Sequence, residues 1–316
     1  MLYKNTFKLM FSNASLIWKL LIYFIVALAF VLGLMFVVSL PIYEVLVAEG
    51  FFEAISDTYF DFITSLNLKV LFENISLLST MFVQIIIGNF TKLVVPIIAF
   101  LFVSIILGGF VFNLYQMPTA GVLNIYMNSN VKQGFMTNFF GTIKRNLAFG
   151  GMYLITLLPL DLGIFALLVY ALRLFKLNGI ILVLAPFILI VGFTLLQSLK
   201  LTLTCGWVPA MVTKNKGVIT GLKGNFIVAK RRFWQTFGNA FVLVVTLIFI
   251  NVFGCLCSFG VALIITIPLS FLLTSIFGMV AYYMSIGQRF YVDPYNVIAP
   301  KTMEYTEKLR TQKYTI

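Results

Sequence analysis

The sequence contains no histidine, and charged residues make up only 10% of its 316 residues. The absence of histidine excludes Ser-His-Asp and Cys-His catalysis, histidine-ligated zinc and pH sensing by histidine. An ordinary soluble domain has about 25% charged residues, so most of the surface of this chain cannot face water. The scarcity of charge therefore points to an integral membrane protein.

Cysteine is also scarce, with three residues in the chain. Cys255 and Cys257 are two positions apart in an apolar segment, where they point to different helix faces. Together with Cys205 they match no zinc-binding spacing, so we expect no metal site and no cofactor. The sequence also contains no glycine-rich phosphate loop and no Gly-x-Ser-x-Gly motif, and we expect no enzymatic activity.

The sequence instead contains several long apolar segments. A spanning helix needs about 20 mostly apolar residues at about 1.5 Å each. The predicted spans are Leu16–Leu40, Val94–Tyr115, Leu147–Leu172, Gly179–Thr204, Phe237–Cys257 and Val261–Ile286. The expected fold is an all-α, polytopic membrane helix bundle with about six transmembrane helices and additional amphipathic interfacial helices.

We expect residues 1–316 to form a single integral membrane domain. It would consist of an N-terminal span in 1–40, an outer loop in 41–93 with amphipathic helices, a five-span core in 94–287 and a cytoplasmic tail in 288–316. The first span is longer than the 7–15 apolar residues of a signal peptide, so we interpret it as a retained helix.

Charge position predicts the orientation. With the N-terminus in the cytoplasm, the predicted inner segments hold 18 of the 22 Lys and Arg residues, which satisfies the positive-inside rule. The even number of spans then places both termini in the cytoplasm. The abundance of Phe, Ile, Leu, Lys and Asn is typical of a bacterium with an AT-rich genome. We therefore expect the bacterial inner (plasma) membrane.

Two segments of the outer loop are predicted to be helices. In Phe51–Leu66 the acids Glu53, Asp57 and Asp61 recur every four residues and share one face. That face indicates either a cation site or, alternatively, the solvated side of a membrane-surface helix. The apolar segment Ile75–Phe90 is short and polar for a span, and it could be interfacial, re-entrant or spanning.

Two inner linkers, Asn113–Arg145 and Thr204–Trp234, follow a common plan. Each leaves a span at a proline (Pro118 and Pro209), continues as an amphipathic stretch and re-enters after basic residues. The two span–linker–span segments have the same orientation and suggest a parallel internal repeat.

In the second linker, apolar residues at helical spacing predict one stripe, and lysines every seven residues border it. Together with basic residues elsewhere on the two linkers, these lysines are candidates for docking a lipid or a partner. The alternative is a basic flank that only sets topology. The stripe consists of Ile219, Leu222, Phe226, Ala229 and Phe233, and the docking candidates are Lys216, Lys223, Lys230, Arg231, Arg232, Lys144 and Arg145. We expect the bilayer as a partner, with a membrane protein or a second copy as further candidates, and no nucleic acid.

Asp161 is the acid predicted to lie within the membrane. A charged group there costs about 2.5–3.5 kcal/mol on insertion scales, so it is a functional candidate by default. Pro159 removes a backbone hydrogen bond next to it, and Gln197 and Asn251 are candidate partners on other helices. Asp161 would serve transport or proton relay, or alternatively hold helices together.

Short motifs in residues 110–255 resemble the YesL-like family, which comprises bacterial membrane proteins with a domain of unknown function. The motifs are Met117-Pro-Thr-Ala-Gly121, Gly134-Phe135, Phe139-Phe140, Lys144, Asp161, Trp207-Val-Pro209, Leu222-Lys223-Gly-Asn225 and Thr236. The pattern of proline, basic linker and next span is also similar to the membrane domain that accompanies glycerophosphodiester phosphodiesterases. The first resemblance implies an accessory role in carbohydrate uptake. The second does not imply catalytic activity, because this sequence does not include the catalytic domain of the phosphodiesterases.

The favoured function is therefore a non-enzymatic accessory or scaffold of a transport or cell-envelope system that docks through its basic linkers. The alternative function is a small solute or ion transporter that uses Asp161.

Overall fold

The computed structural model describes residues 2–175 and 179–299 of the chain. The side chains of residues 68, 69, 72 and 171–186 lie outside the described set, and so does the tail beyond residue 299. Contacts divide the chain into two compact units. One unit is Val26–Val111, and the other combines Met1–Ile25 with Phe112–Ile316.

Six helices among the described residues are long and apolar enough to cross a membrane, which confirms the all-α polytopic bundle. Their ranges are Ser15–Ala48, Phe90–Ser129, Ile143–Tyr170, Phe187–Thr213, Val218–Ser258 and Leu263–Ile286. Several extend past the predicted ends, because the flanking linkers are themselves helical.

The unit Val26–Val111 contains most of α2 (Ser15–Ala48) and continues through α3 (Phe51–Ser65), α4 (Leu68–Gly88), α5 (Phe90–Leu101) and η1 (Phe102–Leu107) into α6 (Gly108–Asn113).

The predicted outer loop 41–93 is almost entirely helical. Helix α2 runs through Pro41 to Ala48, and α3 agrees with the predicted helix Phe51–Leu66. The acids of α3 are exposed, and the Asn74 side chain of α4 donates a hydrogen bond of 3.2 Å to the Asp61 carboxylate. The segment Ile75–Phe90 lies mainly in α4, a 21-residue helix that packs against α3.

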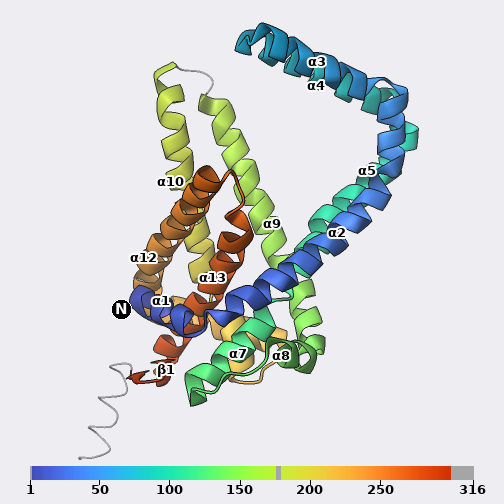
Figure 1. The fold of residues 1–316 in the computed structure, drawn as a ribbon. Helices are drawn as coiled ribbons and strands as arrows, with labels where there is room; N and C mark the ends of the chain where they lie inside the picture. The colour runs from blue at the N-terminus through green and yellow to red at the C-terminus, as the bar shows by residue number, and fades with distance from the viewer. Residues whose placement is uncertain (1, 176–178, 300–316) are drawn as a thin grey trace, which may run out of the picture. The chain divides into compact units, whose positions relative to one another are not determined.

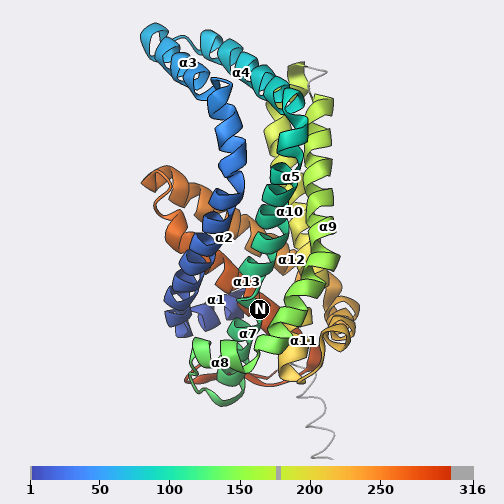
Figure 2. The same ribbon diagram turned by 90° about the vertical axis from the view of Figure 1, so that its right-hand side faces the viewer.

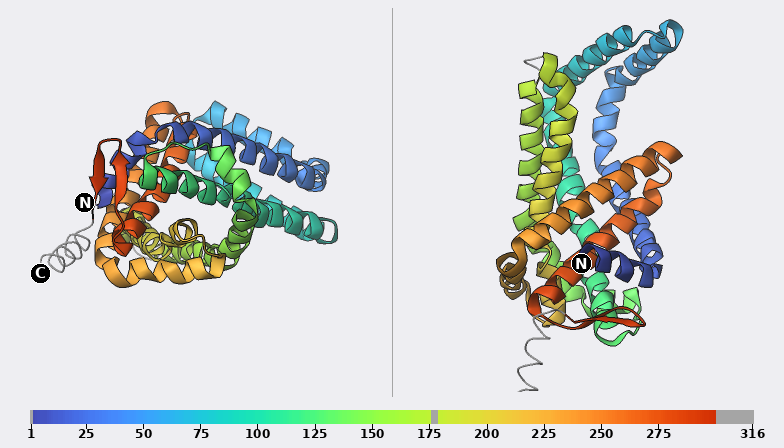
Figure 3. Two further views of the ribbon diagram at one scale, coloured as in Figure 1. Left: turned by 90° about the horizontal axis from the view of Figure 1, so that it is seen from below. Right: turned by 90° about the vertical axis from the view of Figure 1, so that its left-hand side faces the viewer.

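The larger unit consists of a bundle of four long helices and a layer of short ones. Helices α9 (Ile143–Phe175) and α10 (Gly179–Thr204) run antiparallel, α10 packs along α12 (Val218–Ser258), and α12 packs along α13 (Leu263–Ile286) (Figure 1 and Figure 2). The layer lies at the end of this bundle opposite the C-terminal end of α9 (Figure 3). It contains α1 (Leu2–Ser12), α7 (Gln116–Ser129), α8 (Phe135–Gly141), α11 (Trp207–Thr213) and the first half of α12.

The core of this unit is the second half of α13. Every residue from Ile276 to Ser285 is buried, and α1, α7, α11 and α12 pack around them. Helix α7 is also buried on all sides from Met117 to Leu123, so the prediction of an amphipathic stretch is wrong for this part of the first linker. Its small and apolar residues fill the space between α11 and α13, where the Tyr283 hydroxyl donates to the Asn124 side chain at 2.7 Å.

The predicted tail 288–316 begins with folded structure. Strands β1 (Phe290–Asp293) and β2 (Asn296–Ile298) form an antiparallel hairpin, and Phe290 and Val292 are buried against the core. The Ser12 hydroxyl of α1 donates to the Val292 carbonyl at 3.0 Å. At the turn, hydrogen bonds from the Asn296 amide lower the pKa of the Asp293 carboxyl below its ordinary value.

Helix α12 joins the second linker to the fifth span across a kink at Arg232, where φ is −143°. The first half buries Gly221, Asn225 and Val228 against the protein. The predicted apolar stripe is only partly exposed: the exposed fractions of Ile219 and Phe226 are 64% and 62%, whereas Leu222, Ala229 and Phe233 are half-buried and Leu222 packs against the core.

Two prolines mark breaks in the chain where it enters the short-helix layer. Pro118 is the third residue of α7, and its missing N–H would have bonded to the carbonyl of Leu114. The buried Asn146 side chain of α9 donates to that carbonyl at 2.6 Å and replaces the lost donor.

Pro209 is the third residue of α11 and leaves the carbonyl of Cys205 without its helical donor in the same way. Gly278 of α13 lies directly against this carbonyl, and a methyl group at Gly278 would be 2.6 Å from the Cys205 oxygen. The buried Asn225 side chain completes this break, since it accepts from the Gly206 N–H at 2.8 Å and donates to the Leu203 carbonyl. Asn146 thus stabilises the first break, and Asn225 together with the close packing at Gly278 stabilises the second.

Replacing Gly278 with alanine should destabilise the protein, because the backbone of Cys205 cannot move away as a flexible side chain could. We expect the free energy of unfolding to fall by about 1–3 kcal/mol, measured as a lower thermal unfolding midpoint in detergent. Gly192→Ala in α10 is the control, because a methyl group there meets nothing within 4 Å. An equal midpoint for both variants would contradict this packing.

Candidate functional site

A cavity of about 550 Å³ lies inside the larger unit. Helices α9, α10, α12 and α13 provide its long walls, and the first turns of α7 and α11 contribute residues next to the two breaks. Its polar lining comprises Asn113, Tyr115, Gln116, Tyr153, Gln197, Lys200, Thr204, Asn251, Thr274 and Ser275. Aromatic side chains such as Phe149 and Trp207 also line it, so the cavity combines apolar walls with amides, hydroxyls and one ammonium group.

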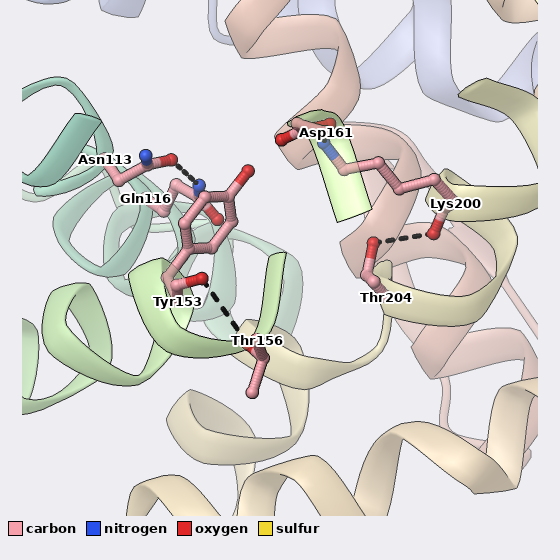
Figure 4. Close-up of polar contacts among 7 residues, drawn as sticks. All are labelled: Asn113, Gln116, Tyr153, Thr156, Asp161, Lys200 and Thr204. Carbon is pink, nitrogen blue, oxygen red and sulfur yellow. Dashed lines mark hydrogen bonds and ion pairs between the residues drawn. The ribbon is translucent and has the colours of Figure 1, made fainter. Parts of the chain in front are cut away.

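Lys200 is the charged residue among those that line the cavity. Its ammonium group forms an ion pair with the carboxylate of Asp161, which comes from α9 (Figure 4). The exposed fraction of the side chain is 15% for Lys200 and 36% for Asp161. Each charge gives the other the partner it needs in a low-dielectric interior, where a lone charge is costly.

Neither Gln197 nor Asn251 is the residue that pairs with Asp161, so the predicted partners are wrong. Asn251 instead links α12 to α13, since it donates to the Ser270 hydroxyl at 2.8 Å and accepts from the Thr266 hydroxyl at 2.9 Å. Both residues nevertheless line the same cavity as Lys200. Pro159 lies inside α9, two residues before Asp161, and the helix continues through it.

The sequence contains a pattern that places Lys200 on a polar helix face, although the count of inner basic residues assigned it to a flank of a span. Lys200 counts as an inner flanking residue by its position near the end of a span. Gln197, Lys200 and Thr204 nevertheless have the i, i+3, i+7 spacing of one helix face, and all three line the cavity. Which residue of α9 faces them depends on the stagger of the α9–α10 pair, which the sequence does not contain.

Polar contacts support this part of the cavity (Figure 4). The Thr204 hydroxyl donates to the Lys200 carbonyl at 2.8 Å. The Gln116 amide donates to the Asn113 side chain at 2.7 Å, which links the start of α7 to the end of α6. Thr204 thus lies one turn after Lys200 on the same helix, and a paired set of amides lies on another wall.

The candidate docking residues separate into two groups. Three arginines contact the protein itself: Arg145 donates to the Asn215 side chain, Arg231 donates to the Ser285 carbonyl at the end of α13 at 3.0 Å, and Arg232 donates to Gln235 at 3.4 Å. The lysines are exposed at the surface, namely Lys144, Lys216, Lys223 and Lys230. The arginines thus have structural contacts, while the three lysines of the second linker border the exposed Ile219 and Phe226.

Among the described residues, no group of three or more Cys, Asp or Glu side chains could hold a metal ion. Comparison of the chain with family profiles, with curated proteins and with solved structures found no match. The fold defines the class of the protein, which is a polytopic helical membrane protein with six candidate spans among its described residues.

The ion pair makes a double-mutant prediction. Lys200→Gln alone or Asp161→Asn alone leaves one charge without its partner, and we expect each to lower the free energy of unfolding by about 1–2 kcal/mol, between the values for exposed and for fully buried pairs because Asp161 is 36% exposed. The double variant should recover most of this loss, as measured by thermal unfolding in detergent. Additive losses would show that the two side chains are not coupled.

Proposed function

We propose that this protein is a membrane transporter for a small polar solute and that the cavity beside Lys200 and Asp161 is its binding site. The cavity carries the proposal. Its volume of about 550 Å³ falls within the roughly 300–1,000 Å³ that is usual for small-molecule sites. Convergent polar groups in an apolar bundle are typical of such sites.

The position of the ion pair supports this proposal. Asp161 lies 18 residues after the start of the 33-residue α9, or roughly 27 Å along a helix about 50 Å long. A charged pair at that depth in a membrane helix marks a pathway for a solute or ion by default. The two broken helices beside the cavity are a further feature of transporter sites, where irregular backbone lines the solute pathway.

We further propose the predicted orientation, with both termini in the cytoplasm of a bacterial cell. The layer of α7, α8, α11 and the first half of α12 would then lie on the cytoplasmic side with its exposed lysines. The positive-inside count of the sequence supports this orientation.

Water should reach the cavity if it binds a polar solute. With Cys205→Ala, Cys255→Ser and Cys257→Ser removing the native thiols, Ser275→Cys should react with a hydrophilic methanethiosulfonate reagent in membrane vesicles. Ser275 lines the cavity. The matched control is Ser198→Cys, because Ser198 is fully buried outside the cavity and should not react. Failure of Ser275→Cys to react above this control would contradict the proposal.

An accessory role, which the sequence and the YesL-like resemblance favour, is the second candidate. The exposed lysines beside exposed Ile219 and Phe226 support it, because an amphipathic surface of this kind suits a partner or a headgroup layer. Our proposal for this role is docking through Lys216, Lys223 and Lys230.

The docking proposal makes its own prediction. Changing the three lysines to glutamine should reduce cross-linking to a membrane partner in native vesicles, because the positive border of the stripe is lost. Lys132→Gln with Lys214→Gln is the control, since these exposed lysines lie outside the stripe. Unchanged cross-linking in the triple variant would contradict docking at this face.

A further inference from the structure

We infer that the solute bound in this cavity is a small monocarboxylate, whose carboxylate replaces Asp161 as the ion-pair partner of Lys200. This inference rests on the proposed function and names its substrate class.

The sign of the cavity charge is the first argument. Lys200 is a positively charged lining residue, and no Asp or Glu is among the described residues that line the cavity. Asp161 neutralises Lys200 from outside that lining. A solute in the cavity therefore meets an ammonium group and neutral dipoles, which favours an anion and disfavours a cation.

The second argument concerns the charge balance of the exchange. An ammonium group without a partner is costly in the bundle, so Lys200 needs a carboxylate whether or not solute is bound. A monocarboxylate meets this need with one negative charge, as Asp161 does. Lysine suits the exchange, because its ammonium group is a compact charge on a flexible four-carbon stem with three rotatable donors.

The two partners of the pair differ in a way that favours exchange. The Lys200 side chain has an exposed fraction of 15% and lines the cavity. Asp161 has an exposed fraction of 36% and lies outside the residues that line the cavity. Lys200 is thus the more enclosed member of the pair and the one that faces the cavity.

Neutral groups on the other walls would recognise the rest of the solute. The Asn113–Gln116 pair, Gln197 and Ser275 offer donors and acceptors for a hydroxyl or carbonyl group. The rings of Phe149 and Trp207 meet edge to face at 5.2 Å and supply an apolar surface. The chemistry fits a short carboxylate with a polar substituent.

The cavity contains its own reporter of binding. Trp207 lines the cavity and has an exposed fraction of 2%, whereas Trp18 and Trp234 are exposed and lie outside it. Trp18→Phe with Trp234→Phe leaves Trp207 as the sole tryptophan of the chain. The probes are L-lactate, L-lactamide and L-alanine, which match in size and differ in charge.

With the full-length protein in nanodiscs, L-lactate should change Trp207 fluorescence saturably and bind about tenfold or more tightly than L-lactamide, the effect of one charge-assisted contact. Asp161→Asn should strengthen lactate binding, because it removes the competing carboxylate, and Lys200→Arg should retain it. The double variant Asp161→Asn/Lys200→Gln keeps the bundle free of unpaired charge and should bind lactate and lactamide equally.

Three results would overturn the inference. Equal binding of lactate and lactamide by the unaltered chain, or tighter binding of alanine, would show a neutral or a zwitterionic ligand and leave the proposed solute site intact. Weaker lactate binding in a folded Asp161→Asn variant would show that the two carboxylates do not compete. A lack of response to all three probes, together with an unreactive Ser275→Cys, would overturn the solute site as well.

Discussion

The larger unit depends on how it stabilises the two helix breaks at Pro118 and Pro209. In an apolar bundle a carbonyl without a partner costs several kcal/mol, so a helix can break only where another group takes over. Asn146 donates to the carbonyl of Leu114 at the first break. At the second break, Asn225 donates to the Leu203 carbonyl and accepts from the Gly206 N–H, and Gly278 allows α13 to pack against the carbonyl of Cys205. These contacts tie α9, α12 and α13 to the short helices and determine where the layer meets the bundle.

The cavity follows from this arrangement. The chain turns out of α6 and α10 at the breaks, and Tyr115, Gln116, Cys205 and Trp207 line the space where the four long helices meet the layer. A space bounded by broken helices and lined with amides is suited to polar chemistry that the lipid-facing surfaces exclude. Lys200 projects into this space, and its pairing with Asp161 allows both charges to exist in the bundle.

The sequence was sufficient for the features that depend on local composition. Apolar length predicts the six spans, and the spacing of Glu53, Asp57 and Asp61 predicts α3. The sequence does not predict the features that depend on packing. The burial of α7 on all sides, the hairpin at Phe290 and the partner of Asp161 arise from contacts between segments far apart in the chain. Lys200 and Asp161 are 39 positions apart, and a small change in the stagger of α9 against α10 would separate them.

The central claim is that Lys200 and Asp161 form an ion pair within the membrane that a solute can open. Solid-state NMR in lipid can measure the dipolar coupling between the ¹⁵N-labelled side-chain nitrogen of Lys200 and the ¹³C-labelled carboxyl carbon of Asp161. The coupling should be strong in the protein alone and should weaken when L-lactate is added. Absence of the coupling in the protein alone would contradict this claim.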